Sequence, residues 1–149
     1  MEVIRAGLEH VAAVAELFDR YRQFYGQSAD AALAEDFIRA RIASGESTVF
    51  LALKTGEAAG FVQLYPSFCS VEAIKIQILY DLFVKPEFRR NGVAEALMNQ
   101  AAEFSRGSGA KRIDLLTGVD NTAGQALYEK LDYKRVPPDF IPFSLEVKN

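Results

Sequence analysis

One stretch of the chain, residues 76–104, restricts the fold most, because a buried strand, a glycine turn and a long helix follow one another there. Ile76 to Val84 is rich in β-branched and bulky apolar residues with Asp81 in its middle, which predicts a central strand buried on both faces. Pro86 marks the exit of this strand, and the apolar positions after Gly92 lie on one face of a helix. This succession is typical of α/β folds.

The rest of the chain repeats such alternation. Apolar runs predict strands at Val3–Ile4, Thr48–Leu53, Gly60–Tyr65, Ile113–Thr117 and Phe140–Val147, and helical spacing predicts helices at Val11–Tyr25, Leu33–Ile42, Val93–Phe104 and Thr122–Leu131. Gly56 suits the turn of a hairpin between the second and third strands. We find no internal repeat, so residues 1–149 are predicted to form a single domain with a mixed sheet and helices on both faces.

Composition excludes several classes of protein. The net charge of −3 and the pI of about 5.2 argue against the basic face that nucleic-acid binding requires. No apolar run is long enough to span a bilayer and no secretory signal is visible, so we expect no membrane partner and a cytoplasmic location. Cys69 is the only cysteine, which rules out an internal disulfide and a cysteine zinc cluster. It is expected to be a small apolar filler, with a role as a covalent group carrier as the alternative.

The turn before the long helix favours an anion. Unpaired N–H groups and the positive end of the macrodipole at a helix N-terminus make a ready site for a pyrophosphate. Gly92 and Ala94 keep bulky side chains away from this backbone, and Arg89 and Arg90 add positive charge. Neither the P-loop string nor the dinucleotide fingerprint G-x-G-x-x-G occurs here, so neither nucleotide fold fits.

The turn resembles that of the Gcn5-related N-acetyltransferase (GNAT) superfamily, whose signature Q/R-x-x-G-x-G/A is matched by Arg89, Gly92 and Ala94. The stretch from Thr117 to Tyr133 is similar to the second motif of that superfamily, and the order of elements agrees over nearly the whole chain. Short stretches such as Phe24–Gln27 are similar to the histone or polyamine acetyltransferase-like branch. Arg90 and Asp132 depart from the pattern, since glycine is frequent at both places.

This resemblance implies an acyl-CoA N-acyltransferase fold, with a mixed, mostly antiparallel, twisted sheet that opens in a V where the pantetheine arm inserts. It implies an acetyl-CoA-dependent N-acetyltransferase that acts by direct attack of a primary amine and needs no metal. The acceptor is a polyamine, a small amine or a protein lysine. Dimers are common among similar proteins, so a homodimer is one expectation. The alternatives are a non-catalytic acyl-CoA-binding regulatory domain and a nucleotide-binding interaction module.

The resemblance also assigns residues to acetyl-CoA. The contacting positions carried over are Leu82, Phe83, Val84, Arg89, Arg90, Asn91, Gly92, Val93, Ala94 and Asn121. The strand residues among them are expected to offer backbone groups, because a bulge in this superfamily splays the strand from its neighbour. Asn121 resembles an asparagine that binds the cofactor, and a plain helix cap is the competing interpretation.

Two residues are candidates for proton transfer. An amine with a pKa of about 10.4 is protonated at neutral pH and needs a base, and Asp81 resembles the carboxylate that serves so in some members. The alternative is that Asp81 only hydrogen-bonds its neighbours. Tyr128 matches the tyrosine that protonates the departing thiolate, with a packing role as the alternative. Three aromatic residues could line an acceptor pocket or belong to the core: Phe24, Tyr25 and Tyr65.

Overall fold

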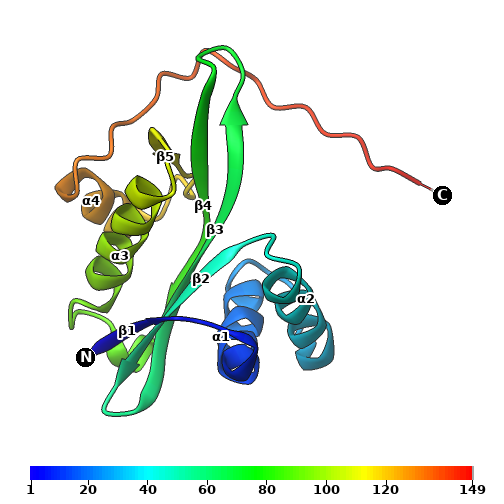
Figure 1. The fold of residues 1–149 in the computed structure, drawn as a ribbon, viewed down its shortest axis with the longest axis vertical. Helices are drawn as coiled ribbons and strands as arrows, with labels where there is room; N and C mark the ends of the chain where they lie inside the picture. The colour runs from blue at the N-terminus through cyan, green and yellow to red at the C-terminus, as the bar shows by residue number, and fades with distance from the viewer. Residues whose placement is uncertain (149) are drawn as a thin grey trace. The chain divides into compact units, whose positions relative to one another are not determined.

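The computed structural model describes residues 1–148, which divide into a compact unit of residues 1–116 and a second unit that begins at Thr117. The first unit contains a five-stranded sheet in the order β1-β2-β3-β4-β5 (Figure 1). Its strands are β1 (Glu2–Arg5), β2 (Thr48–Lys54), β3 (Glu57–Cys69), β4 (Ile74–Val84) and β5 (Arg112–Asp114). β1 to β4 pair antiparallel and β5 pairs parallel to β4, so the predicted mixed, mostly antiparallel sheet is confirmed.

Helices cover both faces of this sheet. α1 (Val11–Phe24) and α2 (Ala31–Ala43) lie against one face, and α3 (Val93–Gly107) lies against the other (Figure 1). Each helix follows from the spacing of its buried residues, which recur every three or four positions along one side. These residues are Val11, Val14, Leu17 and Phe18 in α1, and Val93, Leu97, Met98 and Ala101 in α3.

Strand register decides which residues face α1 and α2. Val49, Leu51, Phe61 and Phe83 share one hydrophobic cluster with the buried residues of these two helices. Val49 lies opposite Gln63, and Phe61 lies opposite Phe83. Because side chains alternate along a strand and opposed residues share a face, Gln63 and its partner Asp81 also point to the side of α1.

Gly60 sets how closely β3 and β4 approach each other. A Cβ atom at this position would lie 2.7 Å from the carbonyl oxygen of Phe83 and 3.1 Å from a methyl group of Val84. Both distances are shorter than ordinary van der Waals contact, so the close backbone approach depends on glycine. The last residues of β4 are thereby held tightly against β3.

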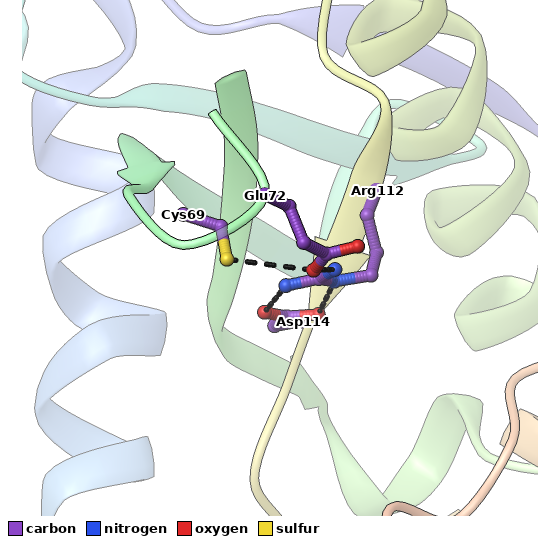
Figure 2. A network of polar contacts seen from close by, with 4 residues as sticks. All are labelled: Cys69, Glu72, Arg112 and Asp114. Carbon is purple, nitrogen blue, oxygen red and sulfur yellow. Dashed lines mark hydrogen bonds and ion pairs between the residues drawn. The ribbon is translucent and has the colours of Figure 1, made fainter. Parts of the chain in front are cut away.

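An ion-pair network joins the far end of the β3–β4 hairpin to β5 (Figure 2). The Arg112 guanidinium donates to both oxygens of Asp114, at 2.7 and 3.2 Å, and also pairs with Glu72. Cys69 Sγ donates to the same Glu72 carboxylate at 3.4 Å. The hydrogen bond from Arg112 is the main reason that the pKa of Glu72 lies below its usual value. All four side chains therefore have a structural partner at this end of the sheet.

Two strands expected from the sequence differ in the structure. The strand expected at Ile113–Thr117 is shorter, since β5 ends at Asp114 and Leu116 is exposed. The strand expected at Phe140–Val147 is wrong, because residues 134–148 contain no strand. Apolar alternation alone does not supply a partner strand, and Pro142 removes a ladder donor in the middle of the segment. Among residues 1–148, no helix has the length and hydropathy that a membrane span requires.

Candidate active site

A β-bulge interrupts β4 at the place where it carries its only acidic residue. Gln63 of β3 lies opposite Asp81, whereas the next residue, Leu64, lies opposite Leu79. Tyr80 is therefore an extra residue in β4 without a partner on β3. Bulges bend a strand and redirect its side chains, and they are frequent next to active sites.

Around this bulge, a buried polar row crosses the sheet. Ser47, just before β2, donates from Oγ to Gln63 Oε1 at 2.7 Å, and Gln63 Nε2 donates to Asp81 Oδ2 at 2.6 Å. The three residues are 8%, 0% and 4% exposed, respectively. Tyr21 of α1 lies beside Asp81, and its hydroxyl donates to the carbonyl oxygen of Tyr80 at 3.1 Å. The carbonyl group that the bulge leaves out of the ladder thus has a partner from α1.

Burial controls the ionisation of this group of residues. It raises the pKa of Asp81 above the ordinary aspartate value, and hydrogen bonds from Gln63 and Tyr21 oppose the shift. Burial and the nearby Asp81 carboxylate also raise the pKa of Tyr21, and they raise that of Tyr65 to about 12. Tyr21 and Tyr65 are therefore neutral near pH 7, and the Asp81 carboxylate is the group here whose charge can change between acid and neutral pH.

Aromatic rings surround the polar row. Tyr65, which is half-buried, packs edge to face on Tyr80 at 5.7 Å between ring centres, and Tyr21 packs in the same way on Tyr25 at 5.0 Å. Phe24 and Tyr25 lie at the end of α1 and are 67% and 54% exposed, so the interpretation that these two residues belong to the hydrophobic core is wrong. The structure thus connects Tyr65 to the Asp81 region through Tyr80, and Tyr25 through Tyr21.

Beyond the bulge, one edge of β4 is open. β5 pairs with β4 only at Ile76–Ile78, although β4 continues to Val84. In the part of the chain that the structure describes, the edge of Leu82–Val84 that faces away from β3 therefore has no strand partner. At the end of this edge, the Val84 carbonyl group accepts from Arg89 Nε at 3.0 Å. This open edge is where an extended ligand could pair with backbone groups.

The turn that follows β4 begins α3 without a capping side chain. Gly92 is the N-cap residue, with φ 75° and ψ 9°, and it has no side chain to accept from the first-turn N–H groups of Val93 and Ala94. Arg90 is exposed and also has a positive φ of 64°. Glycine adopts a positive φ without steric cost, which explains why glycine is frequent at this position of the superfamily signature. The Arg89 guanidinium lies 5.8 Å from the centre of the Phe83 ring and holds the turn to the strand end.

The second unit contains α4 (Thr122–Lys130) and the two remaining candidates. Asn121 caps this helix, since its Oδ1 accepts from the N–H of Gly124 at 3.1 Å, and its Nδ2 donates to Thr117 Oγ1 at 3.0 Å. Tyr128 is half-buried, with its ring centre 6.1 Å from that of Tyr133. Asp132 follows the helix with φ 69°, a left-handed conformation that aspartate tolerates better than most residues.

Comparison with known proteins decides the family. The family model described as "Acetyltransferase (GNAT) family" matches residues 11–133, which include strands β2 to β5, the bulge, the turn and α4. The chain belongs to the GNAT acetyltransferases. The uncharacterized N-acetyltransferase YhfO of Bacillus subtilis (strain 168) is 39% identical to it over 147 residues, which cover 99% of this chain and 98% of YhfO.

Solved structures agree with this GNAT assignment. The crystal structure of a probable acetyltransferase is 36% identical, covers 100% of this chain and 99% of its own, and superposes with a TM-score of 0.88. A predicted acetyltransferase from Clostridium acetobutylicum, solved with acetyl-CoA, superposes with a TM-score of 0.78 over 96% of this chain and 95% of its own. It is only 10% identical, so it supports the GNAT fold alone.

Sequence reasoning missed three residues that lie around Asp81 in this candidate site, namely Ser47, Gln63 and Tyr21. Tyr21 has the spacing of a core residue in α1, and no local pattern distinguishes it from its neighbours. Cys69 lies six residues beyond Gln63 on β3, about 20 Å along the strand, which separates it from Asp81. Among residues 1–148, no three His, Cys, Asp or Glu side chains come together as metal ligands do.

Proposed function

We propose that this GNAT acetyltransferase transfers the acetyl group of acetyl-CoA to a primary aliphatic amine by direct attack, with Asp81 as the base. The observation that carries this proposal is the position of Asp81, which is 4% exposed and lies at a bulge directly before the open strand edge Leu82–Val84. The acceptor class, a cytoplasmic location, a homodimeric state and a single domain of residues 1–149 are predictions from the sequence.

For the cofactor, the residues fit the group that the family uses. First-turn N–H groups of α3 and the guanidinium groups of Arg89 and Arg90 would hold the diphosphate, and Asn91, Gly92, Val93 and Ala94 would shape the turn around it. Leu82, Phe83 and Val84 would offer backbone groups to the pantetheine arm. When bound, acetyl-CoA supplies an activated acyl carbon as a thioester. Asn121, which caps α4, is proposed as a further contact.

In the proposed reaction, the Asp81 carboxylate takes the proton of the incoming ammonium group, directly or through water. An aliphatic ammonium has a pKa of about 10.4, so the nitrogen lone pair is available only after this proton has left. Burial raises the pKa of Asp81, which makes the carboxylate a better proton acceptor than an exposed aspartate. Phe24, Tyr25 and Tyr65 would line the path of the acceptor, where aromatic faces attract a cation.

Tyr128 would supply the proton that the leaving thiolate needs. A phenol with a reference pKa of about 10 can donate to a thiolate with a reference pKa of about 8.5 at short range, although the step is slightly uphill. As the C–N bond forms and the C–S bond breaks, the nitrogen loses the one proton that it carries beyond the amide product, and the Tyr128 hydroxyl regains a proton by way of solvent.

A thiol-release assay tests the proposal. Purified protein is mixed with acetyl-CoA and a thiol reagent, together with a polyamine, a short alkylamine, an arylamine or a lysine peptide in separate reactions. We expect free thiol to appear with an aliphatic amine, and a matched mass increase of one acetyl group on that amine. Binding of acetyl-CoA without release of thiol for any acceptor would instead support the non-catalytic regulatory domain.

A further inference from the structure

The side chain of Gln63 has a role that the base assignment alone does not explain. It is 0% exposed and lies in the middle of β3, inside a layer that is otherwise formed by apolar residues such as Val49, Phe61 and Phe83. A buried amide is costly unless both of its ends have hydrogen-bond partners. Here Ser47 satisfies one end and Asp81 the other, so the three groups form one continuous row.

The direction of these hydrogen bonds depends on the charge of Asp81. An ionised carboxylate can only accept, so the amide must turn its Nε2 toward Asp81 and its Oε1 toward Ser47, which then donates. A carboxyl group that is protonated on the other oxygen still accepts at Oδ2, whereas one that is protonated on Oδ2 donates toward Gln63. In that state the amide can rotate by half a turn, accept from Asp81 at Oε1 and donate from Nε2 to Ser47, because a hydroxyl group both donates and accepts.

The other groups near Asp81 differ from Gln63 in what they can do. The Tyr21 hydroxyl also lies within hydrogen-bonding reach of Asp81, but it has a single proton, for which the carbonyl oxygen of Tyr80 competes at 3.1 Å. Tyr65 is a neutral phenol whose pKa the Asp81 carboxylate helps to raise. The charges of Arg41 in α2 and of Glu46 affect the pKa of Tyr65, which Arg41 lowers and Glu46 raises. Gln63 is therefore the short, buried donor to Asp81, at 2.6 Å.

We propose that Gln63 is a positioning residue that keeps Asp81 hydrogen-bonded in both of its protonation states, by reversing its amide against the hydroxyl group of Ser47. This inference rests on the proposed function, in which Asp81 takes a proton in every turnover. When the proton lies on Oδ2, the oxygen that faces Gln63, a fixed donor would meet the new O–H group and this hydrogen bond would be lost in a buried site. The reversible amide removes that obstacle and keeps the carboxyl group aimed in one direction.

Gln63→Met is the direct test, since methionine has a similar length and no hydrogen-bonding amide. Hydrogen bonds to charged groups are stronger than those to neutral groups, so the ionised state of Asp81 loses more than the protonated state. We expect the acid limb of the pH profile of kcat/KM to move upward by about one pH unit. We expect kcat to fall by about tenfold or more, with little change in the KM for acetyl-CoA.

Ser47→Ala and Val49→Ala separate the proposed role from simple packing. Ser47→Ala deprives the amide of its second partner in both states, so kcat should fall while the acid limb stays in place. Val49 is 1% exposed, lies opposite Gln63 and has no polar group, so Val49→Ala should lower the melting temperature without moving the acid limb. Movement of the acid limb in Val49→Ala would overturn the proposal, as would a wild-type profile in Gln63→Met.

A second measurement does not require catalysis. Across a pH series, the loss of melting temperature caused by Gln63→Met should grow as Asp81 ionises, and it should stop growing in the Gln63→Met/Asp81→Asn double variant. A loss that is the same at every pH would refute the role of Gln63, whatever the acetyltransferase assay gives. Failure of all amines in the thiol-release assay would refute the proposed function, while the melting series would still decide this inference.

Discussion

The left-handed conformation of Gly92 makes the sharpest prediction about the cofactor turn. Its φ of 75° is one that an L-residue adopts at a cost of about 1–2 kcal/mol. A Cβ atom there would meet nothing within 4 Å, so Gly92→Ala adds this conformational cost without a clash. No side chain caps the helix here, and the hydrogen bond from the N–H of Ala96 to the Gly92 carbonyl oxygen, at 3.0 Å, holds only the helix side of the residue. The turn before Gly92 can therefore relax to a negative φ in the free variant. We therefore expect the cost to appear when the turn must re-form around the diphosphate.

This cost converts directly into affinity. Since about 1.4 kcal/mol is a factor of ten, acetyl-CoA should bind about 5- to 30-fold more weakly to Gly92→Ala. The melting temperature of the free protein should change little, and kcat at saturating acetyl-CoA should be largely kept. Titration calorimetry with CoA and the KM for acetyl-CoA both measure the loss. Gly92→Val should lose more, because a β-branched residue is a stronger outlier at positive φ.

Gly109→Ala is a matched control at the other end of α3. Gly109 also has open space around it and a positive φ of 85°, but its turn is fixed by a hydrogen bond from the N–H of Ala110 to the carbonyl oxygen of Ser105. Its cost should therefore appear as a melting temperature lower by about 3–8 °C, with CoA affinity unchanged. If Gly92→Ala binds CoA as wild type does, or if Gly109→Ala weakens CoA equally, the assignment of the turn is wrong.

Three further variants test the other roles. Tyr128→Phe should lower kcat about a hundredfold and leave the affinity for acetyl-CoA unchanged, and full turnover would remove the residue from the mechanism. Asp81→Asn should abolish most turnover. Because burial raises the folded-state pKa of Asp81, wild-type stability falls as pH rises through that pKa. The melting temperature of Asp81→Asn should therefore gain on that of wild type as pH rises from the ordinary aspartate pKa through the folded-state pKa, and a constant difference would contradict this. Asn121→Ala should cost about 1 kcal/mol of stability through the lost cap, and also raise the KM for acetyl-CoA if the residue binds it; an unchanged KM would leave it a cap alone.

Hydrophobic spacing predicted most of the fold because each element buries one continuous apolar stripe. The strands from β1 to β4 and all four helices were placed within a few residues of their observed bounds. The Phe140–Val147 segment failed because its alternation describes what a strand could bury and not whether a partner strand is available. Arg90 and Asp132 show that a departure from a motif can keep the backbone conformation, since both have positive φ values.

The candidate site was only partly predictable. Asp81 could be singled out because a carboxylate inside an apolar strand is unusual. Its partners could not, since the contact of Gln63 with Ser47 and Asp81 depends on a strand register that the bulge shifts by one residue. The contact of Tyr21 with the Tyr80 carbonyl depends on how α1 lies on the sheet, which is a tertiary property.

The extra residue in β4 also determines on which side of the sheet each half of the strand displays its side chains. In a regular strand, Leu79 and Asp81, which are two positions apart, would point to the same side; here Leu79 opposes Leu64 while Asp81 opposes Gln63, so the two point to opposite sides. The bulge therefore reverses the alternation of side chains between the half of β4 that pairs with β5 and the half that carries the carboxylate. If β4 kept Tyr80 but lost the bulge, one half would have to invert, either sending Asp81 through the sheet toward α3 or breaking the pairing of Ile76–Ile78 with β5.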